Sequence, residues 1–427
     1  MPKPKRLGIH VIGPRYGESV ILALPDGGIG VIDSFASRTH HPVMDFLKSQ
    51  FPNQRELRFL ALTHPHADHC YRIADLLGEF TVQEVWIFQP WPLFLVQRYF
   101  ETLSDLGSPD EVEKAMGLPN GSVALSLLEF EKRVGALLKT KKIKYRALAG
   151  GRVFDLCAGQ VKVHFLTPGD QQQYTYQTQL LKATKKMSAD GKSLNNFDNL
   201  PTPDHNLASG ALLVEFGKSR ALLMADAEKE LWDEWLASTP VAKLNPVHFV
   251  KSAHHGSLNG FHGGLYSEIA DPATTIAVVT PFSKGVSPLP SEQGITSLRE
   301  CVKNVYCTNR TVAAASSTLL WKAVTNRLLP SLPPPWVKQI TSKRALAKLL
   351  VPEVGPKAPT GGPEPALPAN WIADAQIKPS LWYLIRPDLR IPLPGLVAAE
   401  DYSVSAYLDN KGNVSEVKAG YEAGILS

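Results

Sequence analysis

Residues 63–70 read THPHADHC, and this stretch places three histidines and one aspartate in eight consecutive positions. The whole chain of 427 residues contains only twelve histidines. The preceding segment, RFLALTH at 58–64, has the apolar composition of a β-strand. The histidines therefore lie on a loop at the carboxyl end of a predicted strand, and the rest of the chain is interpreted from this loop outward.

Histidine and aspartate are ligands that Zn²⁺ and similar divalent ions prefer. His64 and His66 can converge on one ion, while Asp68 and His69 point the other way and can bind a second ion. Two neighbouring ions can hold a hydroxide between them, because they lower the pKa of the parent water. An accidental cluster would not be expected to keep this order directly after a strand. The stretch therefore predicts a site for two metal ions.

The surrounding sequence indicates a layered α/β fold. Runs rich in Ile and Val at 7–13, 19–25 and 28–34 predict short strands, and PDGG is a hairpin turn signal. Strand-like and helix-like segments then alternate, as in folds built from stacked layers. Further strands or hairpins are predicted at 152–169, 211–228, 275–281 and 302–308, and 247–257 repeats the pattern of a strand that runs into a histidine-bearing loop.

Composition predicts the organisation of the chain into parts. Residues 1–327 are expected to form one α/β domain. Within it, residues 91–150 have the apolar spacing of helices, and residues 170–203 are dominated by polar side chains and predict a long mobile loop. Residues 328–370 are rich in Pro and Gly, which is typical of an extended linker. Residues 371–427 predict a small β-rich appendage with a turn at DNKGN.

Charge and cysteine content limit the class of protein. The net charge of +5 is mild, so it permits an anionic partner but does not demand one. The start, MPKPKRLGIHVIG, lacks the apolar segment of a signal peptide, and no stretch approaches the roughly 20 apolar residues of a membrane span. The four cysteines are scattered without a CxxC pair, which is typical of a reducing compartment. We therefore expect a cytoplasmic protein without a membrane segment.

Several motifs together resemble one family. THPHADH matches the HxHxDH signature of the metallo-β-lactamase superfamily, and GESVILALPDGGIGVIDSF is similar to the opening strands of that fold, which end in a supporting aspartate, here Asp33. HNLASGALLVEFGKSRALLMADAE followed by VKSAHHGS resembles the branch related to the C-terminal domain of the competence protein ComEC. The resemblance covers about residues 6–315 and implies an αββα sandwich, here with a helical insertion and the C-terminal appendage.

The resemblance also implies a set of metal ligands. His64 and His66 would bind the first ion, and Asp68 and His69 the second. Asp226 would bridge both ions, with Ala225 before it where the family usually has glycine. The two remaining ligands are His205 for the first ion and His254 for the second.

Two of these assignments stay open at this stage, and the catalytic roles depend on them. Asn206 competes with His205, because many members of the branch have asparagine there. His255 competes with His254, and the histidine that does not bind metal would contact an anionic substrate or donate a proton. Asp68, His255 and Ser257, whose hydroxyl and neighbouring amides could hold a phosphate oxygen, are therefore the candidate catalytic residues.

Other polar features have more ordinary interpretations. Cys70 could be a thiolate ligand but is more typical of a small buried residue under the loop. The basic runs at 137–146 and 182–192 could bind phosphates, although most such runs are solvated. Tyr174 and Tyr176 could stack on bases, although surface aromatics are common.

The predicted site supports three functions. The leading one is a phosphodiesterase or nuclease that uses two divalent ions, Zn²⁺ or Mn²⁺, with a bridging hydroxide and a nucleic acid or nucleotide as substrate. A second is a hydrolase of carboxylic esters or lactones, since one fold serves many reactions. A third is a regulatory subunit of a multi-protein system, such as a bacterial defence system, that docks a protein partner through the C-terminal appendage. Metal identity, exact substrate and oligomeric state are not encoded in these motifs.

Overall fold

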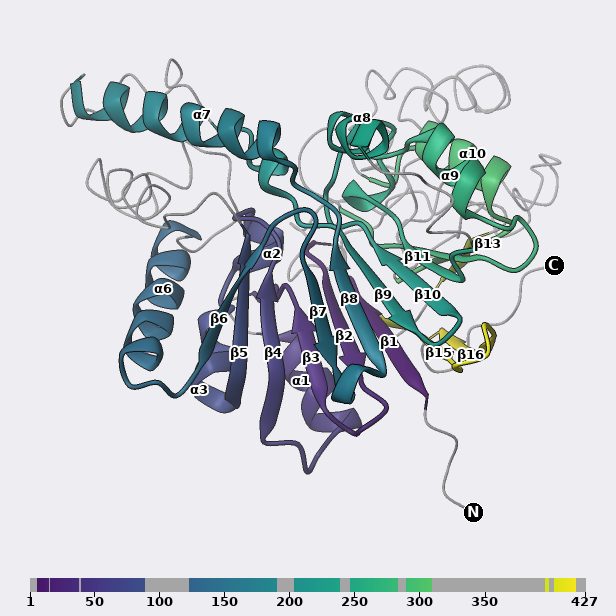
Figure 1. Cartoon of the computed structure of the whole chain (residues 1–427), viewed down its shortest axis with the longest axis horizontal. Coiled ribbons are helices and arrows are strands. Elements are labelled where there is room, and N and C mark those ends of the chain that lie inside the picture. Colours follow the sequence, from purple (N-terminus) through teal and green to yellow (C-terminus); the bar gives the residue numbers. More distant parts are fainter. Residues whose placement is uncertain are drawn as a thin grey trace, which may run out of the picture. The chain divides into compact units, whose positions relative to one another are not determined.

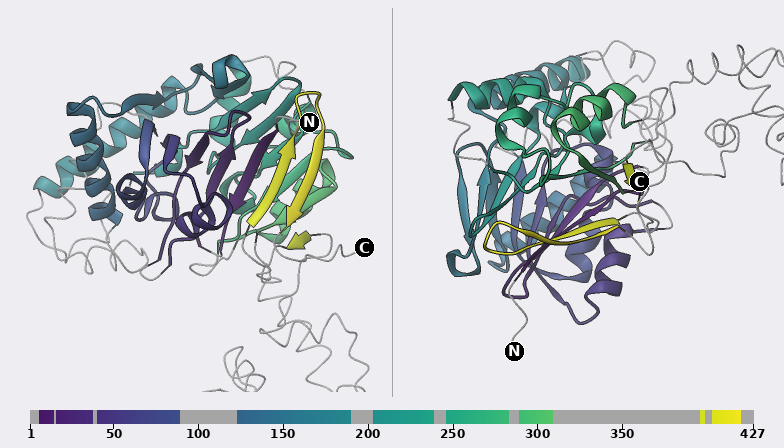
Figure 2. Two further views of the ribbon diagram at one scale, coloured as in Figure 1. Left: turned by 90° about the horizontal axis from the view of Figure 1, so that it is seen from below. Right: turned by 90° about the vertical axis from the view of Figure 1, so that its right-hand side faces the viewer.

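Two β-sheets stacked face to face, with helices on their outer faces, make up the described part of the chain (Figures 1 and 2). The computed structural model describes residues 6–14, 16–37, 40–88, 123–189, 203–238, 246–282, 289–308, 396–398 and 403–419. This arrangement is the αββα sandwich that the sequence predicts. The predicted linker at 328–370 lies outside the described residues.

The first sheet has the strand order β16-β15-β1-β2-β3-β4-β5-β6. Its pairs are antiparallel from β16 to β3 and parallel from β3 to β6. The strands are β1 (Leu7–Ile12), β2 (Ser19–Ala23), β3 (Ile29–Ile32), β4 (Glu56–Leu62), β5 (Thr81–Phe88), β6 (Lys144–Leu148), β15 (Ser403–Leu408) and β16 (Val414–Ala419).

The second sheet has the order β14-β13-β12-β11-β10-β9-β8-β7. Its pairs are antiparallel from β7 to β10 and parallel from β10 to β14. The strands are β7 (Val153–Leu156), β8 (Val161–Phe165), β9 (Leu212–Phe216), β10 (Ser219–Leu223), β11 (Phe249–Lys251), β12 (Ile276–Val279), β13 (Asn304–Cys307) and β14 (Leu396–Ala398).

Helices cover the outer faces of both sheets (Figure 2, right). The helix α10 illustrates how the sequence sets a boundary, because the side chain of Ser291 accepts a hydrogen bond from the backbone N–H of Gly294 at the first turn. The helices are α1 (Pro42–Gln50), α2 (Ala67–Cys70), α3 (Ala74–Glu79), α6 (Val123–Lys139), α7 (Asp170–Ala189), α8 (Lys229–Ser238), α9 (Gly263–Ile269) and α10 (Glu292–Cys301), with 3₁₀ turns η1 (Cys157–Gly159), η3 (His205–Ala208) and η5 (His254–Gly256).

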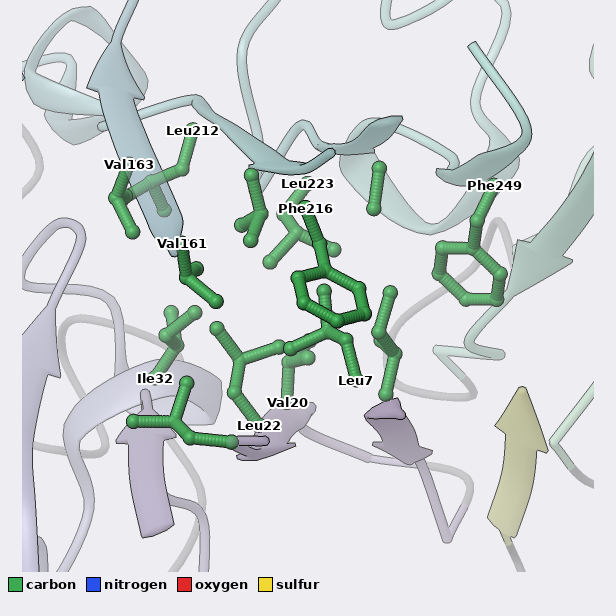
Figure 3. Packing of buried hydrophobic residues seen from close by; sticks show 14 of the residues in the cluster. Leu7, Val20, Leu22, Ile32, Val161, Val163, Leu212, Phe216, Leu223 and Phe249 are labelled. Carbon is green, nitrogen blue, oxygen red and sulfur yellow. The ribbon is translucent and has the colours of Figure 1, made fainter. Parts of the chain in front are cut away.

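The core between the sheets follows from alternation along each strand. In Figure 3, Leu7, Val20 and Leu22 of the first sheet point toward Phe216 and Leu223 of the second. All of these side chains are buried. Full burial of one such side chain contributes about 1.5–3 kcal/mol, so this layer holds the two sheets in a fixed relation.

The structure confirms most of the predicted strands. The three N-terminal runs form β1, β2 and β3, and the hairpins at 152–169 and 211–228 form β7–β8 and β9–β10. In the segment at 91–150, α6 is helical as expected, but residues 144–148 form β6 in the first sheet, and residues 89–122 lie outside the described part. The segment 144–148 pairs in parallel with β5 from Glu84↔Lys144 to Phe88↔Leu148, and its last two residues are buried, which favours a strand.

The expectation of a mobile loop at 170–203 is wrong for its first twenty residues, which form α7. Gln172, Tyr176, Leu180 and Ala183 repeat at helical spacing and are buried, which gives the polar segment one packed face. No Gly or Pro interrupts the helix. Polar composition therefore hid a helix that packing stabilises.

The expected C-terminal appendage is also corrected. Residues 403–408 form β15, which pairs antiparallel with β1 from Leu7↔Leu408 to Ile12↔Ser403. Figure 2 (left) shows β15 and β16 beside β1. Val404, Ala406 and Leu408 are fully buried in the core between the sheets. These strands complete the first sheet, so the described part of 371–427 belongs to the sandwich and gives no basis for a separate docking module.

The turn between β15 and β16 also ties the first sheet to the second. The backbone N–H of Lys218, in the β9–β10 turn, donates to the carbonyl of Asn410 at 3.0 Å. The hydroxyl of Ser219 donates to the carbonyl of Asp409. The C-terminal hairpin therefore links the two sheets at this turn.

We expect Ala406→Asp to destabilise the whole sandwich. The substitution places a carboxylate without a partner between the sheets, which costs on the order of 3 kcal/mol or more. Urea unfolding followed by circular dichroism measures the loss. Ser415→Asp, on the exposed side of β16, is the matched control and should unfold close to wild type. Equal midpoints for the two variants would contradict the placement of β15 in the core.

A second prediction concerns His10, which is buried among Phe46, Phe51 and Tyr407, with Nδ1 2.7 Å from the hydroxyl of Ser405. Burial, with a contribution from a nearby lysine, lowers the pKa of His10 to about 4. Protonation of His10 is therefore easier in the unfolded chain than in the folded one. The contribution of His10 to the free energy of unfolding is complete above pH 6.5 and is lost as the pH falls toward 4. The total effect is on the order of 3 kcal/mol.

His10→Gln should remove this part of the acid sensitivity. The measurement is the free energy of unfolding of wild type and variant at several pH values between 7 and 4.5. His40→Gln, which changes an exposed histidine, is the control and should keep the wild-type slope. A His10→Gln variant with the same slope as wild type would show that His10 is not responsible.

Candidate metal centre

The candidate site lies where several strands of the two sheets end. Asp33 follows β3, residues 64–69 follow β4, Asp226 follows β10 and His255 follows β11. The pairs β3/β4 and β10/β11 are parallel, so their carboxyl ends meet at one edge of each sheet. The short helix α2, which carries Asp68 and His69, lies at that edge of β4 (Figure 1).

His64, His66 and Asp226 form the first group of candidate ligands. Nε2 of His64 lies 3.0 Å from Nδ1 of His66 and 3.8 Å from Oδ2 of Asp226. Nδ1 of His64 lies 3.1 Å from the hydroxyl of Thr63, which itself donates to Asp33 and therefore accepts from His64. Nε2 of His64 is then free of a proton, as a metal ligand must be.

His69, His255 and Asp226 form the second group, with Glu18 also within 4.8 Å of their ligand atoms and Asp68 beside them. Nε2 of His69 lies 3.4 Å from Oδ1 of Asp226 and 3.6 Å from Oδ2 of Asp68. Nε2 of His255 lies 2.9 Å from Oδ2 of Asp68 and 3.9 Å from Oδ2 of Asp226. Asp226 therefore contacts both groups, which is the position expected for a bridging ligand.

The far sides of two rings are fixed by hydrogen bonds. Nδ1 of His69 lies 2.8 Å from Oδ2 of Asp33. Asp33 also accepts hydrogen bonds from Thr63, at Oδ1 from the backbone N–H and at Oδ2 from the hydroxyl. Nδ1 of His255 lies 3.1 Å from the carbonyl of Thr280, so this nitrogen donates. Both rings therefore present Nε2 to the centre in the orientation that a ligand needs. Asp33 has the supporting position that the sequence resemblance implies.

The donor set fits two divalent cations. Nε2 of His69 and Oδ1 of Asp226 are buried and make no hydrogen bond of acceptable geometry. The four buried carboxylates of the described residues all lie here, and Lys251 is the one buried ammonium among them. Buried negative charge of this density is unfavourable without cations. Imidazole and carboxylate together suit Zn²⁺ or Mn²⁺ better than Ca²⁺.

The carboxylates control the protonation of the histidines when no ion is bound. Burial lowers the pKa of His69, but Asp226, Asp68 and other carboxylates outweigh it and raise that pKa well above its usual value. Burial raises the pKa of Asp226, but His69 and His255 outweigh it and hold the pKa well below its usual value. An ion that binds here must therefore displace a proton from His69.

His205 lies beside the first group, as the sequence indicates. Its ring centroid is 5.3 Å from that of His66, and the hydroxyl of Tyr176 lies 2.7 Å from Nδ1. Burial and the nearby His66 lower the pKa of His205 well below its usual value, which keeps the ring neutral. Asn206 instead donates to Glu228 at 2.9 Å. These contacts favour His205 over Asn206 as the third ligand of the first ion.

The structure separates the two adjacent histidines, whose roles the sequence left open, and favours His255 as the ligand. His255, expected to contact substrate, is 1% exposed and belongs to the second ligand group. His254, the metal ligand that the sequence resemblance favours, instead forms an ion pair with Glu228 at 2.8 Å and is in neither ligand group. Both residues have positive φ, 43° for His254 and 53° for His255, and this kink directs their side chains apart.

The third candidate catalytic residue, Ser257, shapes the loop. Its hydroxyl accepts a hydrogen bond from the backbone N–H of Gly260 at 3.1 Å, and its own backbone N–H donates to the carbonyl of His254. Ser257 therefore closes the turn that carries the two histidines and is not part of either ligand group. Cys70 is fully buried in the core below α2, as its ordinary interpretation predicts.

Backbone strain is concentrated around the ligands. Asp33, Ala225, His254 and His255 all have φ between 43° and 59°, a region that costs side chains about 1–3 kcal/mol each. Hydrogen bonds hold these turns, including one from the N–H of His254 to the carbonyl of Ala225 at 2.9 Å. Ala225 adopts a conformation for which glycine is favoured, which is consistent with the glycine that the resembled family usually has there.

Sequence reasoning missed three features of the site. Glu18 and Lys251 are buried beside the second group and form an ion pair. Tyr16 lies between Phe35 and Phe282, with ring centroids 4.8 and 5.0 Å away, and Phe282 lies 5.2 Å from His255. For Glu18 and Lys251, the available signal was a charged residue directly beside an apolar run. Glu18 precedes the run in GESVIL, and Lys251 follows the run in VHFVK.

Comparisons with known proteins give weak structural similarities. No protein-family model and no curated protein sequence matches the chain. The chain is similar to the metallo-beta-lactamase fold protein YhfI from Bacillus subtilis, with 12% identity over 71% of this chain and 96% of that chain and a TM-score of 0.37. It is also similar to a diphosphatase from the PhnP family, with 10% identity, 71% and 85% coverage and a TM-score of 0.32.

A third similar structure is a HARLDQ-motif mutant of a metallo-beta-lactamase from Cronobacter sakazakii, with 15% identity, 57% and 75% coverage and a TM-score of 0.31. Because all three TM-scores are below 0.5, the site rests on this chain's own residues. No helix among the described residues is long and apolar enough to span a membrane.

We expect metal binding to release at least about one proton per chain near pH 7, because His69 is protonated before the ion arrives and must be neutral to bind it. Calorimetric titration with Zn²⁺ in buffers of different ionisation enthalpy counts the protons. His10→Gln, a histidine variant remote from the site, should release the same number. Binding without proton release would contradict the raised pKa of His69.

Proposed function

We propose that this chain is a hydrolase that uses two divalent metal ions, Zn²⁺ or Mn²⁺, and acts on phosphodiesters as a phosphodiesterase or nuclease. The observation that carries the proposal is the position of Asp226, whose carboxylate faces His64 at 3.8 Å and His69 at 3.4 Å. One carboxylate shared by two groups of imidazoles is the arrangement that a pair of ions needs. The sequence resemblance to the ComEC-like branch supports the phosphodiester as the bond that is cleaved.

The ions would polarise a phosphoryl oxygen and lower the pKa of a water, and such catalysis is shared by many hydrolases. The chain's own residues must then select the substrate. His254 is well placed for this, because it is 21% exposed at the site while Glu228 holds its Nδ1 at 2.8 Å. Burial lowers the pKa of His254, but Asp226 and Glu228 outweigh it and raise that pKa.

In this position His254 can contact an anionic oxygen or give a proton to a leaving oxygen. Glu228 also accepts hydrogen bonds from Asn206 and Asn259, both at 2.9 Å. The carboxylate is therefore held in place and in turn orients the imidazole. This assigns to His254 the substrate-side role that the sequence analysis gave to one of the two adjacent histidines.

Helix α7 supports a polyanionic or nucleotide substrate. Its buried Tyr176 contacts His205 at the site, and its exposed face carries Tyr174, which is 67% exposed, together with Lys182 and Lys185. Lys182 is six residues from Tyr176, or about 9 Å along a helix axis. We propose a nucleic acid or nucleotide as the substrate in the cytoplasm, because an exposed aromatic ring and exposed lysines lie on the same helix whose buried face contacts His205.

We expect wild-type protein loaded with Zn²⁺ or Mn²⁺ to hydrolyse bis-p-nitrophenyl phosphate, and Asp68→Ala to reduce kcat/KM by at least about 100-fold, because a ligand of the second ion is lost. Initial rates by absorbance measure the effect. Asp45→Ala, which removes an exposed aspartate of α1, is the control and should keep the wild-type rate. Activity that survives Asp68→Ala would contradict the proposed site.

The same assay can separate the two adjacent histidines. His255→Gln should lower both metal content and activity, while His254→Gln should keep two ions per chain and lose more activity with a dinucleotide than with the better p-nitrophenyl leaving group. Hydrolysis of lactones or carboxylic esters without any phosphodiesterase activity would contradict the proposed substrate class and favour an ester or lactone hydrolase.

A further inference from the structure

A buried ion pair connects the two sheets behind the second ligand group. Lys251, at the end of β11 in the second sheet, binds the carboxylate of Glu18, which precedes β2 in the first sheet. Their side chains are only 1% and 3% exposed. An ion pair at this depth is poor at stabilising a fold, since apolar replacements of such pairs are often neutral or stabilising. Its place in the structure therefore calls for another explanation.

Lys251 supports the turn that carries the bridging carboxylate. Its Nζ donates to the carbonyl of Ala225 at 3.4 Å, and its own carbonyl accepts a hydrogen bond from the N–H of Met224 at 3.3 Å. Ala225 is the strained residue, with φ of 45°, that directly precedes Asp226. Lys251 thus holds the strained turn from its buried side.

Glu18 supports the two other parts of the second group. Its backbone N–H donates to the carbonyl of Asp68 at 3.0 Å. Its Oε2 accepts a hydrogen bond from the hydroxyl of Thr280 at 2.5 Å and lies 3.4 Å from Nδ1 of His255. Thr280 and Glu18 together therefore surround the donating side of the His255 ring.

Glu18 does not lie where a ligand would lie, although its carboxylate is within 4.8 Å of ligand atoms in the second group. It faces Nδ1 of His255 and Nδ1 of His69, at 3.4 and 3.9 Å. The Nε2 atoms of both rings face Asp68 and Asp226 instead. Glu18 is therefore on the side of the rings opposite to the ion, and Lys251 neutralises it there.

From these contacts we propose that the Glu18–Lys251 pair is a positioning element that sets the affinity of the second metal ion. It holds His255 and the turn before Asp226 from behind, and none of the contacts described above reaches His64 or His66, the two residues that only the first group contains. The inference rests on the proposed function in one respect, namely that the chain binds two ions. It adds a positioning role for two residues that would contact neither the ions nor the substrate.

The test is a titration of metal-free, full-length protein with Co²⁺, followed by visible absorption and calorimetry, which needs no turnover. For Lys251→Met and Glu18→Gln, we expect the first equivalent to lose less affinity than the second, because His64 and His66 are not held by the pair whereas Asp226 belongs to both groups. The second should bind about 10- to 100-fold more weakly, as for other residues that support a ligand, and with an altered absorption band.

The double variant Glu18→Gln/Lys251→Met separates positioning from simple charge balance. It leaves no buried charge without a partner, so its thermal unfolding should return close to wild type, while the defect in the second equivalent should remain. Thr280→Val, which removes the hydroxyl that contacts both Glu18 and Nδ1 of His255, should fold normally and weaken the second equivalent in the same direction.

A matched control is the ion pair between Glu84 and Arg146, 2.6 Å apart in the first sheet. The variant Glu84→Gln/Arg146→Met should bind both equivalents as wild type does. Restored binding and absorption in the Glu18/Lys251 double variant, or unchanged second-equivalent binding in the single variants and Thr280→Val, would overturn the inference. Wild-type protein that binds fewer than two ions would instead overturn the proposed function, and the inference with it.

Discussion

Glu18, Asp33, Asp68 and Asp226 are buried within one small region at the carboxyl ends of the strands, and charges in such surroundings need cations or hydrogen-bond donors close by. Lys251 and the backbone and hydroxyl donors satisfy Glu18 and Asp33. The remaining two carboxylates face imidazole nitrogens. The neutralisation of these acids therefore explains why the loops adopt strained conformations here and why the histidines gather around them.

The layered fold follows from local patterns, whereas the completion of its sheets depends on distant contacts. Alternating apolar residues identify β1 to β5 and the later hairpins, because each run is amphipathic or buried over its own length. The pairing of β15 with β1 joins residues such as His10 and Ser405 that are 395 positions apart. Local composition cannot encode such a partner, so the same residues resemble an independent appendage. Helix α7 was hidden for a related reason, since Tyr176, Leu180 and Ala183 become buried only through packing against residues distant in the sequence.

The residues of the site also divide into those that a local pattern predicts and those that depend on distant contacts. The spacing in THPHADH brings His64, His66, Asp68 and His69 to one site because a single loop carries them, and their roles as metal ligands stay predictions. The assignment of His254 and His255 depends on a kink of the backbone that their sequence does not reveal. Glu18 and Lys251 were not recognised either, because a charged residue beside an apolar run reveals its role only through its partner on the other sheet.

The strand order of the first sheet has a consequence for the life of the chain before it is complete. During synthesis β1 emerges early, and its partner β15 follows nearly 400 residues later. At ribosomal rates of about 5–20 residues per second, the outer edge of β1 stays without its neighbour for roughly 20 to 80 s. An open strand edge invites pairing with other chains, so newly made protein depends on chaperones or on rapid closure by its own last strands.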